Sequence, residues 1–154
     1  MHFKKHILIG FVASYILVYF FNFSPLSGLI IFLSSWLIDG DHYFWYAIET
    51  KDWNPIHAIN WYRKSIPKWF KLSIEEREKF RRGVFLCHGI IFWIVLAALS
   101  FVHEFFIWIL IGVAIHMVAD WIDLIRRCEP LYNKIFPLYV IKRNKNKKPL
   151  KELH

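Results

Sequence analysis

Long apolar runs alternate with short polar stretches along this chain. Four runs are each long enough for a helix, at residues 7–21, 26–38, 84–102 and 105–119. At about 1.5 Å per residue, only the third run approaches the ~30 Å of a bilayer core. The shorter runs would span with help from flanking residues or a thin bilayer. The core of a soluble helical protein is the alternative explanation for them.

The region between the second and third runs has a different character. Residues 52–73 mix Trp and Tyr with Lys and Arg, a composition that suits the headgroup zone of a membrane. Ser73 and Glu76 form a capping box that predicts a helix from Ile74. We expect that helix to continue into the third apolar run.

These patterns predict a single all-α domain over residues 1–154, an integral membrane bundle of about four helices in two antiparallel hairpins. The first hairpin covers residues 1–42 and the second covers 74–127. An interfacial aromatic and basic loop covers 43–73, and a basic cytoplasmic tail covers 128–154, of which residues 142–154 are expected to be solvated.

Composition and charge support a membrane location. The chain is 56% hydrophobic and 19% aromatic, richer in apolar residues than most soluble domains. Its net charge of +8 would also suit nucleic acid, but Lys and Arg occur only within 4–5, 51–82 and 126–151. The positive-inside rule then makes both termini and the middle loop cytoplasmic, in the cell or inner membrane. Anionic headgroups suffice as partners for these charges, so nucleic-acid binding is disfavoured.

The hairpin arrangement determines how far each polar residue within the apolar runs lies from the hairpin tip, and therefore its depth in the membrane. His6 and Asp39 are equidistant from the Asn22–Phe23 turn, and His88 and His116 are equidistant from Val102. If the hairpins pack side by side, seven side chains converge near the cytoplasmic end: His6, Asp39, Asp41, His42, His88, His116 and Asp120.

These residue types point to a metal. His116 and Asp120 are four apart and share one helix face. In the Asp39-Gly40-Asp41-His42 motif, we expect Gly40 to let the backbone turn so that several side chains point inward. Ionisable groups in apolar segments cost roughly 2.5–3.5 kcal/mol on insertion scales and usually serve a function. His and Asp together suit zinc, and also manganese or iron.

Simpler interpretations exist for each residue. Asp39 and Asp41 could mark the membrane boundary, and His88 could bond a backbone carbonyl. His116 with Asp120 could be a structural pair between helices. Their shared height favours one functional site over these separate explanations.

The same residues resemble the YdjM-like family of membrane-bound, metal-dependent hydrolases. His6, the Asp39-Gly40-Asp41-His42 motif, His88 and the His116-x-x-x-Asp120 motif follow the order of that family over residues 1–125. The family is distantly similar to zinc-dependent phospholipase C and related all-helical nucleases, which cleave phosphoesters with closely spaced metal ions.

One departure weakens the match. The family usually has His-Arg-Gly-x-Thr-His before the third segment, whereas here only His88 remains, with Gly83 and Cys87 in place of the first His and of Thr. A ligand or a substrate contact is therefore missing, and His57 is a candidate to replace it.

The resemblance implies a phosphoesterase that uses a divalent cation, most often zinc, held among the seven residues. A metal-activated water would attack the substrate, and Asp39 or Asp120 could accept its proton. Arg81, Arg82 and Lys79 could hold a phosphate, although headgroup anchoring explains them equally well. The cytoplasmic location suggests an amphiphilic, phospholipid-like phosphoester. A non-catalytic metal-binding membrane protein and a purely structural membrane protein are the alternatives.

Overall fold

The computed structural model describes residues 3–150, and within them the regular structure is helical apart from one isolated bridge between Phe80 and Lys148. The predicted all-α class is therefore correct. In chain order the helices are α1 (Phe3–Phe21), α2 (Pro25–Leu37), α3 (Gly40–Thr50), α4 (Pro55–Lys71), α5 (Ile74–Arg77), α6 (Ile90–Ser100), α7 (Glu104–Arg126), α8 (Tyr132–Ile135) and α9 (Pro137–Asn144).

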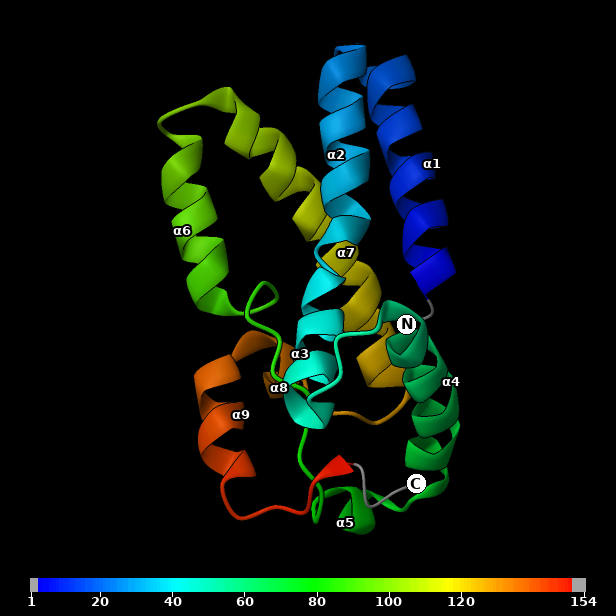
Figure 1. Ribbon diagram of the computed structural model, residues 1–154. Helices are drawn as coiled ribbons and strands as arrows, with labels where there is room; N and C mark the ends of the chain where they lie inside the picture. Colours follow the sequence, from blue (N-terminus) through cyan, green and yellow to red (C-terminus); the bar gives the residue numbers. More distant parts are fainter. Residues whose placement is uncertain (1–2, 151–154) are drawn as a thin grey trace.

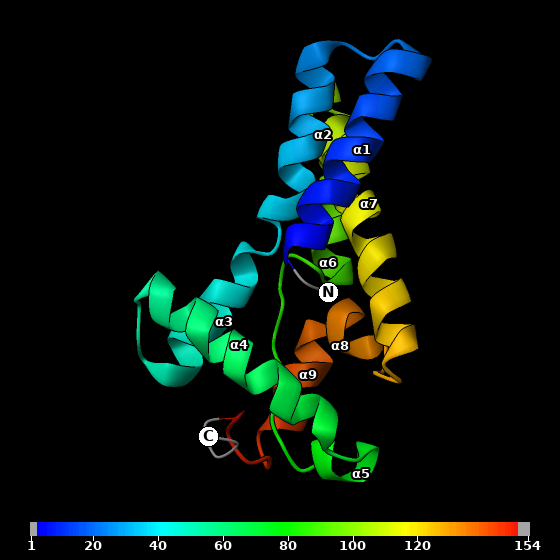
Figure 2. The ribbon, with the colours of Figure 1, turned by 90° about the vertical axis from the view of Figure 1, so that its right-hand side faces the viewer.

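The apolar runs form two hairpins whose tips lie at the same end of the molecule (Figures 1 and 2). At the first tip, Asn22 takes the left-handed conformation, and the Ser24 side chain caps α2 by accepting from the Ser27 N–H. At the second tip, the His103 ring caps α7 by accepting from the Phe105 N–H. The helices α3, α4, α5, α8 and α9 gather at the opposite end.

The two hairpins are joined mainly through α2 and α7. Gly112 on α7 permits this approach, because a Cβ there would lie 2.4 Å from the Ile31 carbonyl oxygen and 2.0 Å from the Ser34 Oγ. Small residues allow such close backbone packing between helices. A core of Ile38, Leu96, Val113 and Met117 lies beside this contact and holds α6 and the C-terminal end of α2 against α7.

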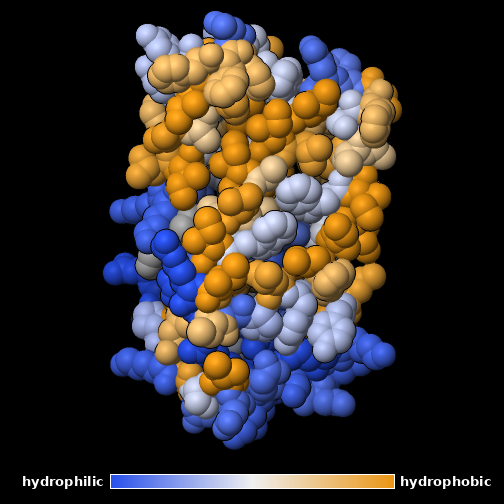
Figure 3. Space-filling model, turned by 180° about the vertical axis from the view of Figure 1, so that it is seen from behind, coloured by the Kyte–Doolittle hydropathy of each residue, from blue (hydrophilic) through white to orange (hydrophobic). Residues whose placement is uncertain are grey.

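Two described helices are long and apolar enough to cross a membrane, Lys4–Phe21 and Glu104–Arg126. The α6 helix is also apolar but has 11 residues, and α2 has 13. Large apolar side chains are exposed along these helices and at the tips, where Phe101 is 93% exposed. On the face seen in Figure 3, apolar side chains cover most of the upper part apart from polar ones at the top edge, and hydrophilic side chains gather at the lower end and along one side.

The helix that begins at the capping box does not reach the third apolar run. Ser73 and Glu76 form the predicted box, but α5 ends at Arg77, and helix resumes only at Ile90. The intervening residues make tertiary contacts instead: Arg81 N–H donates to the Lys148 carbonyl, and Arg82 N–H donates to the Asn144 side chain. The region expected to be an interfacial loop, 43–73, is largely α3 and α4.

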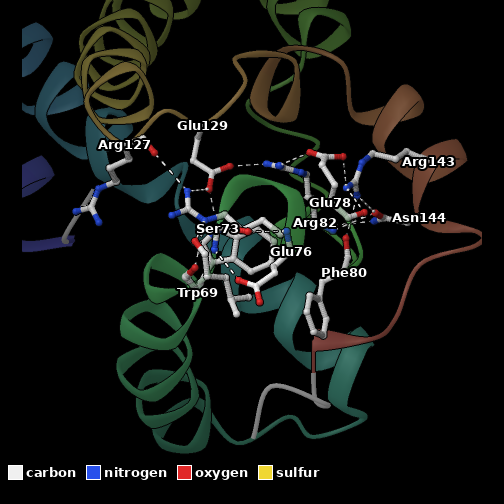
Figure 4. A network of polar contacts seen from close by, with 12 residues as sticks. Trp69, Ser73, Glu76, Glu78, Phe80, Arg82, Arg127, Glu129, Arg143 and Asn144 are labelled. Carbon is white, nitrogen blue, oxygen red and sulfur yellow. Dashed lines mark hydrogen bonds and ion pairs between the residues drawn. The ribbon is translucent and has the colours of Figure 1, made fainter.

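The basic tail packs against the rest of the chain before the expected solvated end at 142–154, where the described residues other than Asn144 are exposed or half-buried. Val140 and Asn144 on α9 are buried, and Glu129 lies under the loop that follows α5. Glu129 accepts from Arg77, Arg82 and the Trp69 indole, while Glu78 pairs with Arg82 and Arg143 (Figure 4). This network fastens the C-terminal segment to the middle of the chain. Residues 151–154 lie outside the described residues.

Candidate metal centre

Four parts of the fold bring the seven predicted residues together at the inner end of the hairpins. His6 lies on α1, and His116 and Asp120 lie on α7. His88 lies in the loop just before α6, and Asp39, Asp41 and His42 lie where α2 passes into α3. Asp39 is the N-cap of α3, yet its side chain makes no capping hydrogen bond. Its carboxylate is instead directed at the histidines.

Four side chains offer donor atoms that all lie within 4.8 Å of one another: Asp39, His88, His116 and Asp120. The His88 and His116 Nε2 atoms are 3.0 Å apart. Asp120 Oδ2 lies 3.3 Å from His116 Nε2 and 3.5 Å from His88 Nε2. Asp39 Oδ1 lies 3.5 Å from His116 Nε2 and 3.7 Å from His88 Nε2. Ligands of a tetrahedral zinc ion, at about 2.0–2.1 Å from it, are separated by about 3.3 Å.

The hydrogen bonds of the two rings determine which nitrogen carries a proton. His88 Nδ1 is 2.8 Å from Asp41 Oδ2, and His116 Nδ1 is 2.8 Å from the Ser35 carbonyl oxygen. Both partners are acceptors, so each Nδ1 donates, and each neutral ring then has a lone pair on Nε2. Two lone pairs facing each other at 3.0 Å repel unless a cation, a proton or a metal ion, lies between them. The two outer partners orient the rings as is typical of metal-binding histidines.

His6, Asp41 and His42 surround this group rather than belong to it. His6 Nε2 is 3.2 Å from Asp120 Oδ1, and its ring stacks on His116. Asp41 accepts the hydrogen bond from His88 Nδ1 described above. His42 Nε2 is 3.3 Å from Asp39 Oδ1, and Asp41, His42 and His88 form a second, overlapping group of possible ligands.

The burial of the site is uneven. The His88 and His116 side chains are fully buried and that of Asp120 is 4% exposed, whereas those of Asp39 and His42 are 15% and 30% exposed. The more exposed side chains of the group therefore lie on the α3 side. Burial would raise the pKa of Asp39, but the surrounding imidazoles and the Lys134 ammonium hold that pKa well below its usual range. Burial and the Lys134 charge hold the pKa of His42 well below its usual value.

The most important residue that sequence reasoning missed is Lys134. It lies on α8 with its side chain 8% exposed, and its Nζ is 3.0 Å from Asp120 Oδ2 and 2.8 Å from His42 Nε2. Phe85 was also missed, although its ring stacks on His42 and lies 4.3 Å from the same Nζ. One signal was available: Lys134 lies between Tyr132 and Phe136, outside the polar lysine-rich end of the chain.

Two of the three proposed phosphate-holding cations, Arg81 and Arg82, have partners outside the cluster. Arg82 is buried against Glu129 and Glu78, and Arg81 donates to the Lys147 carbonyl and lies 3.5 Å from Glu49. Lys79 is exposed. We therefore assign Arg82 to the fold rather than to a substrate. His57 is also outside the site, because it is exposed and pairs with Asp52 at 2.8 Å.

Gly40 does not have the role expected of it. It has no positive φ, and a Cβ at that position would meet no atom within 4 Å. The side chains of the Asp39-Gly40-Asp41-His42 motif are directed inward because α2 ends and α3 begins there, and the freedom of glycine is not needed.

No family model matches the chain, and no curated protein or solved structure shows significant similarity to it. The resemblance to the YdjM-like family therefore rests on the motifs alone. What the described residues establish is a buried His/Asp cluster that could hold a metal ion.

Proposed function

We propose that this chain is a membrane-embedded, metal-dependent hydrolase that cleaves a phosphoester of an amphiphilic substrate. One observation carries the proposal. Two buried imidazole nitrogens face each other at 3.0 Å between two carboxylates, and both rings are oriented through their other nitrogen. A purely structural pair of histidines would not need four converging donor atoms.

The membrane part of the proposal extends the two candidate spans. We propose that α2 and α6 accompany α1 and α7 in the bilayer, since both are apolar and pack against α7. The distribution of Lys and Arg supports cytoplasmic termini, with the hairpin tips outside. The metal centre would then lie at headgroup depth, where a phospholipid-like substrate presents its phosphoester.

The residues of the centre would have different roles in binding the ion and in transferring a proton. Asp39, His88, His116 and Asp120 would hold the ion, zinc being the best fit to their mixed nitrogen and oxygen donors and manganese or iron the alternatives. A divalent ion there would polarise a phosphoryl oxygen and bring the pKa of a water close to neutrality.

Asp39 is the better candidate to accept the proton of the attacking water. Its side chain is more exposed than that of Asp120, so a water can reach it more readily. Asp120 is committed on both oxygens, to His6 through Oδ1 and to Lys134 through Oδ2. We therefore assign metal binding alone to Asp120, and to Asp39 both metal binding through Oδ1 and the proton transfer.

Hydrolysis of phosphoesters by the detergent-purified protein tests this function. We expect turnover of bis-p-nitrophenyl phosphate and of short-chain phosphatidylglycerol, lost on chelation and restored by zinc or manganese. His116→Ala should be inactive while remaining folded, and His57→Gln, which removes an exposed histidine outside the site, should retain activity. Metal-loaded wild type without turnover on either ester would favour a non-catalytic metal-binding protein.

A further inference from the structure

The ammonium group of Lys134 lies at the edge of the metal centre and shares a ligand with it. Asp120 Oδ2 belongs to the four-atom group, and it is also 3.0 Å from Lys134 Nζ. The second contact of the ammonium is His42 Nε2, at 2.8 Å. His42 thus accepts a hydrogen bond from lysine through the nitrogen it would otherwise offer to an ion.

This arrangement is the one expected of a second cation. In two-metal hydrolases the ions lie about 3.5–4 Å apart and stabilise the attacking and leaving oxygens together. Here Asp120 Oδ2 contacts the other donor atoms of the four-atom group on one side and the Lys134 ammonium on the other. The Phe85 ring, 4.3 Å from Nζ, adds a cation–π contact that helps to hold the charge in place.

Charge balance within the described residues agrees with one ion. Asp39, Asp41 and Asp120 are all within the cluster, and Lys134 is the one lysine that contacts it. Three carboxylates and one ammonium leave two negative charges, which a single divalent ion neutralises. Buried charges are strongly disfavoured unless they are paired, so a second divalent ion would leave a surplus of positive charge.

We propose that the centre holds one divalent ion, and that Lys134 takes the place of a second ion and binds a phosphate oxygen of the substrate. The phosphate part of this inference rests on the proposed function, whereas the number of ions does not. An ammonium suits this role because it is a compact charge with three donors that can serve a carboxylate, an imidazole and an incoming phosphate together.

Metal counting by mass spectrometry on the purified, zinc-reloaded protein tests the first part. We expect one zinc per chain in the wild type and in Lys134→Met, which removes the charge and keeps the apolar stem. Lys134→Glu would raise the cluster's charge to four negatives and add a ligand, so it should bind two zinc ions. Two zinc ions in the wild type would overturn the proposal without need of any variant.

Binding of inorganic phosphate to the zinc-loaded proteins, measured by calorimetry, tests the second part. We expect affinity to fall at least tenfold in Lys134→Met and to be retained within threefold in Lys134→Arg, with circular dichroism confirming that both are folded. Equal affinity in wild type and Lys134→Met would overturn the role in phosphate binding.

The two proposals fail in different ways. One zinc, tight phosphate binding and no ester hydrolysis would contradict the hydrolase while leaving the role of Lys134 intact. Two zinc ions with turnover would contradict the role of Lys134 while leaving the hydrolase intact.

Discussion

At the scale of single residues, metal binding depends on the groups that accept hydrogen bonds from the histidine Nδ1 atoms: the Asp41 carboxylate for His88 and the Ser35 carbonyl for His116. Asp41 accepts from His88 Nδ1 and so keeps the lone pair on Nε2 directed at the metal position. Such partners are typically worth about 10–100-fold in metal affinity. His116 obtains the same orientation from a backbone carbonyl, which no side-chain substitution can remove.

Asp41→Asn should therefore weaken zinc binding by about 10–100-fold without changing the number of ions bound. The amide is nearly isosteric but offers a weaker, uncharged acceptor. Competition against a fluorescent chelator measures the affinity, and His57→Gln is the matched control. Unchanged affinity would mean that Asp41 does not orient the ring.

The seven converging residues could be predicted because each lies in or beside a hairpin helix, so that its depth follows from its distance along the chain to the hairpin tip. Lys134 was missed, because the contact requires the chain to reverse after α7. Cys128 makes that reversal possible by adopting a positive φ, which is uncommon for a residue with a side chain. Nothing in the local pattern of hydrophobic residues predicts such a backbone conformation.

At the scale of elements, the closest approach is that of α2 and α7 at Gly112. Gly112→Ala would place a methyl group 2.4 Å from a backbone oxygen, so one of the helices must move. Overpacking of this kind typically costs about 1–3 kcal/mol. We expect a lower melting temperature in detergent and weaker zinc binding, because His116 lies one turn further along α7.

Gly40→Ala is the matched control, since a Cβ there meets open space and the residue lies within α3. We expect its melting temperature and zinc affinity to equal or exceed those of the wild type. A loss in Gly40→Ala as large as that in Gly112→Ala would contradict this account of the helix packing.

The contact between the segment after α5 and α9 should be sensitive to pH. Burial raises the pKa of Glu78, but hydrogen bonds from Arg143 and Arg82 outweigh it and lower the pKa below the ordinary value. The unfolded chain therefore binds the proton more readily, and stability from this group is present above about pH 4.5 and lost below it.

Melting curves between pH 6 and pH 3.5 measure the effect. The wild type should lose melting temperature more steeply than Glu78→Gln as the pH falls below about 4.5. Parallel curves for the two proteins would show that Glu78 does not contribute to the pH dependence.

The same contacts explain why the helix that begins at Ile74 does not continue into the third apolar run, contrary to expectation. A capping box marks where a helix can begin, but it does not determine where the helix ends. Gly83 and Gly89 have low helix propensity, and Arg82 makes ion pairs with Glu129 as well as with Glu78 within its own segment. Partners that are distant in sequence are invisible to a local pattern, so the extended segment could not be predicted.

At the scale of the whole molecule, the proposed orientation gives opposite exposures to two sites. Val102 lies at a hairpin tip, is 78% exposed and would face outward, whereas the exposed native Cys128 follows α7 at the other end. In intact cells that express the chain, a membrane-impermeant maleimide should label Val102→Cys in a background where both native cysteines are serine. In the chain that keeps its native cysteines, Cys128 should react only after permeabilisation. Labelling of Cys128 but not of Val102→Cys in intact cells would contradict the orientation.

X-ray absorption spectroscopy of the zinc-loaded protein reports which atoms surround the ion. We expect two imidazole rings with nitrogens at about 2.0–2.1 Å and oxygen atoms as the remaining ligands. These rings are His88 and His116, so the imidazole signal should vanish or halve in His116→Ala. A first shell without imidazole, or with three or more rings, would contradict the centre formed by Asp39, His88, His116 and Asp120.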